Sequence, residues 1–166
     1  MSKFKHFKAN LFRNSTLKKY FPKEARDKLE KAVASAEKGH RGELKIVVEV
    51  AMPLDLASIS NRAFIRAKQL FGLFSIWDTE DNSGVLIYLN LAERSLEIIA
   101  DRGIHNKVGK EKWTSCMEDA IKAIKENNSP VEGILFLLTE ISLLLKEYFP
   151  AGPDDINELE DKPVFI

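Results

Sequence analysis

Apolar residues recur along the chain at two spacings, and these spacings separate helices from strands. A repeat of three and four residues predicts helices over 23–38, 59–72, 113–124 and 130–148. Runs of β-branched and other apolar residues without that repeat predict strands over 43–50, 85–91 and 95–100. Helices and strands therefore follow one another in the order expected of an α/β protein.

The order of these elements also predicts how the strands pair. A strand, a helix and a second strand in succession favour a parallel pair joined by a right-handed crossover. The short link 92–94 makes the second and third strands an antiparallel hairpin. Since the helices can cover both faces, we predict a three-layer α/β/α sandwich with a small mixed sheet.

The hairpin predicts which side chains meet at one edge of this sheet. A turn centred on Glu93 places Val85 opposite Asp101 and Gly84 opposite Arg102. The acidic loop 77–84 directly precedes the second strand, so it lies at the same edge. The start of the first strand lies there too if the first two strands are parallel. Segments that are distant in the sequence are thus expected to converge.

Oxygen-bearing side chains of the converging segments are candidates for holding a divalent cation, because hard cations such as calcium prefer oxygen ligands. The candidate metal ligands are Asp78, Glu80, Asp81, Asn82 and Asp101, followed by Glu37, His40 and Glu43. The candidate catalytic residues are Asp101 and Arg102. A purely structural interpretation stays open, in which the acidic loop is a solvated turn, Asp101 caps backbone amides and Glu37 ends a helix.

Common site motifs do not account for these residues. The acidic loop is not an EF-hand, because its glycine arrives one position late and Leu89 stands where the bidentate glutamate belongs. The chain also lacks a phosphate-binding glycine loop, a dinucleotide fingerprint, a nucleophile elbow and a zinc-protease motif.

Composition adds limits on the class of protein. The 166 residues, 45% of them hydrophobic, are enough for one domain with a core. Lys plus Arg and Asp plus Glu are each 25, so no overall field favours nucleic acid as a partner. The single cysteine, Cys116, lies in a helical pattern and is expected to be an inert core thiol in a reducing compartment.

Charge is nevertheless uneven between the two ends of the chain. Cations precede any acid at the start, at Lys3, Lys5, Lys8, Arg13, Lys18 and Lys19. Acids dominate the end, at Asp154, Asp155, Glu158, Glu160 and Asp161. We therefore divide the chain into a basic segment over 1–20, a domain over 21–150 and a solvated acidic tail over 151–166.

The apolar stretches of the sequence indicate where in the cell the protein is located. The N-terminus has no apolar core of a secretion signal, and the longest apolar stretch, 133–145, is shorter than the about 20 residues that a span needs. We therefore expect a cytoplasmic protein without a transmembrane segment. Phe4, Phe7 and Leu11 stand at helical spacing among lysines, which is typical of peripheral membrane contact or of packing on the domain, and we favour packing.

Ordered short motifs between about Phe21 and Pro150 resemble a known family. They are AEKGHRGE and LKIVVEV over 36–50, WDT over 77–79, DNSGVLIY over 81–88, LEIIADRGI over 96–104, Trp113, and YFP over 148–150. In this order they resemble the TPM domain family, which is named for a thylakoid lumen protein, a photosystem II repair protein and a nematode receptor modulator. The chain is similar to a soluble bacterial subgroup.

The resemblance implies an α/β/α fold with a mixed sheet. Some relatives are described as acid phosphatases, and a calcium-dependent site in acidic loops at one sheet edge has been proposed for the family. By position, this site would use Asp81, Asn82 and Asp101. The signal peptide, anchor and glycine-rich tail of secreted members are not found in this sequence, so lumenal or periplasmic roles are not carried over.

Two functions remain as hypotheses, and whether the protein is an enzyme stays open. One is a non-catalytic interaction or assembly module for an unknown protein partner, with a candidate divalent-cation site at the sheet edge. The other is a metal-dependent acid phosphatase for phosphomonoesters, in which Asp78, Asp81 and Asp101 hold the cation and Arg102 stabilises phosphoryl charge. We favour the first, because no residue is a convincing nucleophile or base.

Overall fold

Two strands at the centre of the molecule are buried along their whole length, which explains why most of their residues are apolar. They are β1 (Leu44–Glu49) and β2 (Val85–Asn90), and they pair in parallel. β3 (Ser95–Ala100) joins β2 in the predicted antiparallel hairpin. The structure is a computed structural model that describes residues 2–152 and 157–166.

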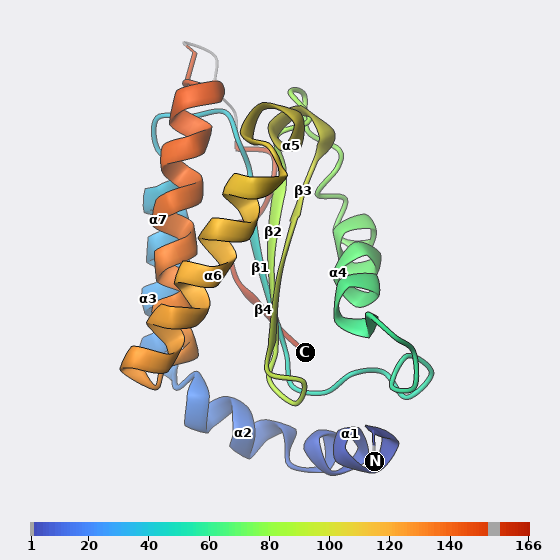
Figure 1. Cartoon of the computed structure of the whole chain (residues 1–166). Coiled ribbons are helices and arrows are strands. Elements are labelled where there is room, and N and C mark those ends of the chain that lie inside the picture. Colours follow the sequence, from blue (N-terminus) through green and yellow to red (C-terminus); the bar gives the residue numbers. More distant parts are fainter. Residues whose placement is uncertain (1, 153–156) are drawn as a thin grey trace.

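Helices cover both faces of the sheet, so the predicted α/β/α sandwich is confirmed (Figure 1). α3 (Lys23–Ala36), α6 (Lys110–Asn127) and α7 (Pro130–Tyr148) form the layer on one face. α4 (Arg62–Leu73) forms the layer on the other. Among the described residues, no helix combines the length and apolarity that crossing a membrane needs.

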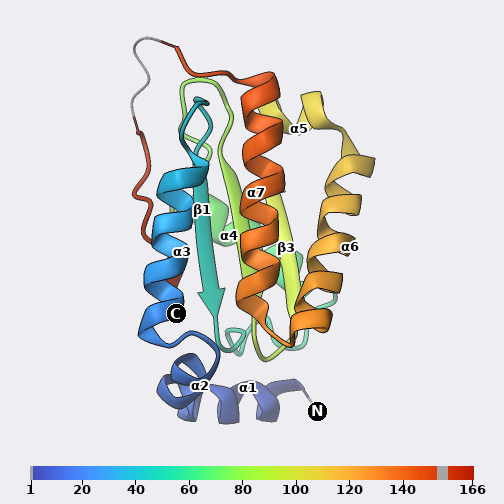
Figure 2. The ribbon, with the colours of Figure 1, turned by 90° about the vertical axis from the view of Figure 1, so that its left-hand side faces the viewer.

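Three short helices occupy the two ends of the sheet. α1 (Ser2–Leu11) and α2 (Arg13–Tyr20) lie across the end at which β1 and β2 finish (Figures 1 and 2). α5 (Arg102–Val108) lies at the opposite end, where these strands begin. The two ends therefore offer chemically separate surfaces.

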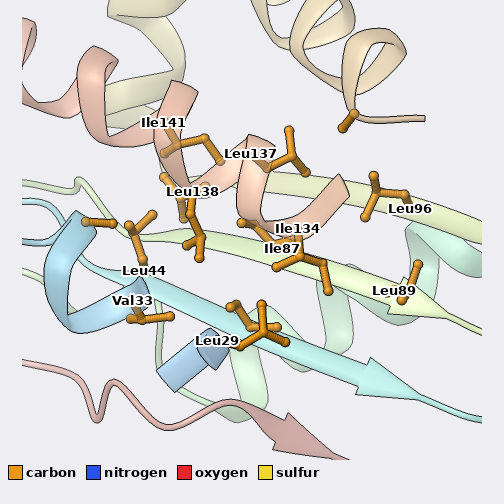
Figure 3. Close-up of a cluster of buried hydrophobic side chains, with 14 of the residues drawn as sticks. Leu29, Val33, Leu44, Ile87, Leu89, Leu96, Ile134, Leu137, Leu138 and Ile141 are labelled. Atoms are coloured by element: carbon orange, nitrogen blue, oxygen red, sulfur yellow. The ribbon is translucent and has the colours of Figure 1, made fainter. Parts of the chain in front are cut away.

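The main hydrophobic core fills the space between the sheet and the layer of three helices (Figure 3). Its labelled members are Leu29, Val33, Leu44, Ile87, Leu89, Leu96, Ile134, Leu137, Leu138 and Ile141. α7 lies between its neighbours in this layer, which is why it is apolar over most of its surface. Cys116 is buried here, as expected, and burial raises the pKa of its thiol.

The predicted register of the hairpin is wrong by one residue. Val85 pairs with Ala100, and the Asp101 N–H donates to the carbonyl of Gly84 at 2.9 Å. The turn holds four residues, with Arg94 in the left-handed region at φ 54°. A shift by one residue exchanges the faces of a strand. Asp101 therefore leaves the sheet opposite Gly84.

The end of the chain is a part of the sheet, whereas the sequence predicts a solvated tail. β4 (Val164–Phe165) pairs in parallel with β1, giving the strand order β3-β2-β1-β4. The Val50 N–H donates to the carbonyl of Ile166 at 2.8 Å. Two strand residues carry too little periodicity to be recognised from sequence. The predicted acidic tail residues Asp154 and Asp155 lie outside the described residues.

The start of the chain also differs from expectation. α1 turns His6 inward, where this side chain is completely buried. Phe4 and Leu11, which we expected to pack on the domain, are 67% and 69% exposed. The side chain of Phe7, the third member of that predicted stripe, lies outside the described residues. The prediction that this stripe packs on the domain is therefore wrong for Phe4 and Leu11.

Removal of residues 163–166 should test the role of β4. We expect a loss of about 2 kcal/mol in unfolding free energy, because Phe165 packs against Phe21 with ring centroids 5.5 Å apart. The amide of Val50 should exchange faster with solvent, since it loses its acceptor. The amide of Leu91, which donates to Glu49 on the other side of β1, is the internal control. Equal protection of both amides after truncation would contradict this role.

Candidate functional site

The loops that precede β1 and β2 lie side by side, as the sequence predicts. The guanidinium of Arg41 reaches the Asp81 carboxylate, with Nη1 2.9 Å from Oδ2. The Ser83 hydroxyl donates to the Arg41 carbonyl at 3.0 Å, and the Val85 N–H donates to the Glu43 carbonyl at 2.8 Å. Sequence reasoning missed Arg41, although a cation opposite an acidic loop is a recognisable signal.

Asp101 forms the junction between β3 and α5. Its Oδ1 accepts a hydrogen bond from the Arg102 N–H at 2.7 Å, so Asp101 caps the helix, as the structural interpretation predicts. The side chain is 9% exposed, and its Oδ2 is buried without a hydrogen-bond partner among the described residues. One carboxylate oxygen is therefore used and the other is unsatisfied.

The acidic loop approaches this junction through its backbone. Gly103 lies so close to it that an added Cβ would be 2.5 Å from the Asn82 carbonyl oxygen and 2.6 Å from that of Asp81. The Ile104 N–H donates to the same Asn82 carbonyl at 3.3 Å. Asn82 has φ 52°, a left-handed conformation that asparagine tolerates well. Only glycine allows this approach at position 103.

These atoms fit a calcium ion in part. Calcium accepts backbone carbonyl, carboxylate and water oxygens, and the turn offers Asp101 Oδ2 and the carbonyls of Asp81 and Asn82. Within 2–152 and 157–166, however, no three His, Cys, Asp or Glu side chains are placed to hold a metal. A cation bound here would take its remaining ligands from water.

The other predicted residues of the acidic loop are not drawn into this turn. The side chains of Asp78 and Glu80 are exposed. The Glu80 N–H donates to both carboxylate oxygens of Glu158, at 3.2 Å each. The Ser83 N–H donates to the Thr79 hydroxyl at 3.0 Å, which closes the loop. Asp78 and Glu80 form a solvated rim beside the turn.

Glu37, His40 and Glu43 each accept hydrogen bonds from backbone amides. The carboxylates of Glu37 and Glu43 also interact with the C-terminal segment. The Leu44 N–H donates to Glu37 Oε1 at 2.9 Å, and the Gly42 N–H donates to His40 Nδ1 at 3.1 Å. Glu43 is 4% exposed and accepts from two amides of the C-terminal segment, at 2.9 and 3.1 Å. The three residues therefore help to hold loops and the end of the chain.

Burial perturbs the acids of this second group. It raises the pKa of Glu37 to about 9, and the nearby Glu43 and Asp161 carboxylates add to the shift. It also raises the pKa of Glu43. Lys45 is 6% exposed and donates to the Glu160 carbonyl at 2.6 Å, while burial lowers its pKa. Sequence reasoning missed Lys45, although Glu43 and Lys45 stand two residues apart along a strand and so lie on the same face of the sheet.

The comparisons with known proteins agree with this architecture. The family model of the TPM domain matches residues 16–142. The chain belongs to the TPM domain family. A comparison with curated proteins gives no match.

Solved structures similar to this TPM domain include two from bacteria. The BA42 protein of the psychrophilic Bizionia argentinensis is 26% identical, with a TM-score of 0.74 over 86% of this chain and 93% of that one. The N-terminal domain of a P. gingivalis protein is 14% identical, with a TM-score of 0.57 over 80% of this chain and 83% of the other. The second likeness shows the fold alone.

A further polar network of the TPM domain was missed from the sequence. The Tyr88 hydroxyl donates to Glu49 Oε2 at 2.6 Å, and Arg66 pairs with the same carboxylate at 2.9 Å. The Asn90 side chain donates to the Tyr88 hydroxyl at 3.0 Å. Glu49, Tyr88 and Asn90 are all buried, and burial raises the pKa of Tyr88. The side chains of Glu49, Tyr88, Asn90 and Arg66 therefore satisfy one another at this end of the sheet.

Gly103→Ala should test the close approach at the candidate site. We expect a loss of about 1–3 kcal/mol in unfolding free energy, because the new Cβ overlaps two backbone carbonyls that must move. Gly72→Ala is the matched control. Its Cβ meets nothing within 4 Å, so the helix should gain about 0.5–1 kcal/mol. Denaturant unfolding of both variants measures the difference, and equal effects would contradict the geometry.

Glu37→Gln should change how stability depends on pH. The folded pKa of about 9 exceeds the ordinary value of 4.5, so the contribution of Glu37 is fully present below about pH 4.5 and is lost as pH rises through 9. Glutamine does not ionise. The variant should therefore gain on the parent by at least about 1 kcal/mol between pH 5 and pH 9. Exposed Glu30→Gln on the same helix is the control, and parallel pH curves for Glu37→Gln and the parent would refute the burial argument.

Proposed function

We propose that this TPM domain is a non-catalytic interaction module that binds a divalent cation, calcium in the first place, at the turn of Asp81, Asn82 and Asp101. The observation that carries the proposal is the buried and unpaired Asp101 Oδ2, two residues before Gly103, which the carbonyls of Asp81 and Asn82 approach closely. Leaving such an oxygen unsatisfied costs about 1–3 kcal/mol or more. A hard cation offsets that penalty.

The partial ligand set supports a recognition role. A calcium ion takes six to eight oxygen ligands, and this turn supplies only a few from the protein. Water fills the other positions, and a backbone carbonyl of a protein partner can replace it. Exposed Asp78 and Glu80 form the rim through which such a partner approaches. A cytoplasmic location is part of this proposal, supported by the single buried thiol of Cys116.

Phosphomonoester hydrolysis is the second candidate, and Arg102 is the observation in its favour. Its side chain is exposed next to Asp101 and forms no ion pair within the described part of the chain. A guanidinium beside a bound cation can stabilise charge that develops on a phosphoryl group. The candidate lacks a positioned nucleophile or base, so we place it second.

Calcium titration followed by backbone amide NMR tests the cation site. We expect saturable shifts of the amides of Asn82 and Gly103 together, with a dissociation constant in the range of about 0.1–1 mM, because few protein ligands contribute. Asp101→Asn should weaken binding at least tenfold, or about 1.4 kcal/mol. Asp119→Asn, an exposed carboxylate on α6, is the matched control and should bind as the parent does.

Arg41→Gln should change the calcium affinity in the opposite direction to Asp101→Asn. Arg41 now pairs with Asp81 and offsets its charge, so its removal should tighten calcium binding. Calcium-dependent hydrolysis of p-nitrophenyl phosphate that is lost in Arg102→Gln would instead favour the phosphatase. Independent shifts of the two amides, or none, would refute the cation site.

A further inference from the structure

The first helices form a layer that is fixed to the domain by one face only. His6 is fully buried, and its Nδ1 accepts from the Met52 N–H at 2.9 Å. Its Nε2 lies 2.8 Å from Glu93 Oε1. Leu17 of α2 and Phe21 behind it are also buried. We call residues 2–20 the N-terminal arm, and these contacts determine which face of it turns outward.

The outward face of the arm is apolar. Phe4, Leu11 and Phe12 are 67%, 69% and 59% exposed, which is unusual for side chains of this size. In α1, Phe4, Lys8 and Leu11 are spaced by four and three residues and so form one stripe. His6 stands on the other side of the same helix. The anchoring of His6 thus directs the stripe away from the domain.

The arm is also cationic throughout. It contains no Asp or Glu, and its basic residues are Lys3, Lys5, Lys8, Arg13, Lys18 and Lys19, in a chain whose acids and bases balance overall. Among the lysines of the arm whose side chains the structure describes, Lys5 alone forms an ion pair, with Glu93 at 3.5 Å. The Lys8 ammonium lies 4.7 Å from the Phe4 ring. Exposed aromatic and aliphatic groups therefore alternate with uncompensated positive charge.

We propose that the N-terminal arm docks on an anionic lipid surface, with α1 and α2 in the plane of the interface. Apolar side chains enter the acyl boundary in such docking, while lysines contact anionic headgroups. A second copy of this chain fits the surface poorly, because two arms without a single acid repel each other. Nucleic acid would match the lysines and leave Phe4, Leu11 and Phe12 unused.

The position of the arm sets the orientation of the docked molecule. The arm crosses the end of the sheet at which β1 and β2 finish, and α5 with Asp101 lies at the opposite end (Figures 1 and 2). The proposed cation turn therefore faces away from the lipid. The docking does not depend on that turn.

Cosedimentation of the full chain with vesicles tests the proposal. We expect binding to vesicles of phosphatidylcholine with phosphatidylglycerol, little binding to phosphatidylcholine alone, and release at high salt. Lys8→Gln with Lys18→Gln should lower affinity about 30-fold, since each cation near an anionic surface contributes about 1 kcal/mol. Lys122→Gln with Lys125→Gln on α6 is the matched control and should have little effect.

The apolar part of the docking needs its own variants. Phe4→Ser with Leu11→Ser should lower affinity roughly tenfold or more, whereas Leu143→Ser, which removes a 56% exposed leucine from α7, should not. Amide NMR spectra of each variant establish that it is folded. A paramagnetic lipid should broaden amides of 4–20 and spare those of 82–103.

Several results would overturn the proposal. They are equal binding to neutral and anionic vesicles, no sedimentation with either at low salt, and control variants that weaken binding as much as the arm variants do. Concentration-dependent dimerisation that Phe4→Ser with Leu11→Ser abolishes would assign the face to a second copy instead. Tighter binding to an RNA or DNA oligonucleotide than to anionic vesicles would assign it to nucleic acid.

Discussion

The buried carboxylate of Glu49 is the constraint on which much of this fold depends. It ends the central strand β1 at 5% exposure, where an unpaired charge would be strongly destabilising. Arg66 of α4 and Tyr88 of β2 satisfy it, and both approach from the same face of the sheet. α4 can therefore pack on that face only in the position that brings Arg66 to Glu49. A nonspecific apolar contact would not fix the helix in this way.

The same polar contacts continue to the N-terminal arm. Asn90 donates to Tyr88 and accepts from the Glu93 N–H, and the Glu93 carboxylate pairs with Arg62 and His6. Burial lowers the pKa of His6, although Glu93 acts in the opposite direction, and Nδ1 of His6 accepts a hydrogen bond from the Met52 N–H. β1, β2, α4 and α1 are thus joined at one end by groups that satisfy one another.

The sequence predicts the fold well because a strand or helix that is buried carries a recognisable pattern of apolar residues. The apolar runs of β1 and β2 and the helical repeats of α3, α6 and α7 each carry that pattern over many residues. The register was missed because it depends on a local choice, in which Asn90 accepts from Glu93 and Arg94 adopts φ 54°. Nothing in the apolar pattern separates three turn residues from four.

The candidate site was predictable in its location and less so in its atoms. Parallel pairing of β1 and β2 requires their preceding loops to meet, and this follows from the order of elements alone. Which carboxylates face the place where these two loops meet depends on the path of the C-terminal segment. Glu43 turns toward amides of the C-terminal segment, which no local signal in the sequence indicates.

The two ends of the sheet differ in how well their buried carboxylates are paired. Where β1 and β2 finish, Glu49 and Glu93 find several partners each, and that end serves to hold α4 and the N-terminal arm. Where they begin, the buried Asp101 Oδ2 is unsatisfied, and the backbone of the acidic loop packs against the nearby Gly103. Proteins concentrate such unfavourable arrangements where binding later compensates them. Because the N-terminal arm lies across the end that holds Glu49 and Glu93, Asp101 lies at the end of the sheet opposite to the arm.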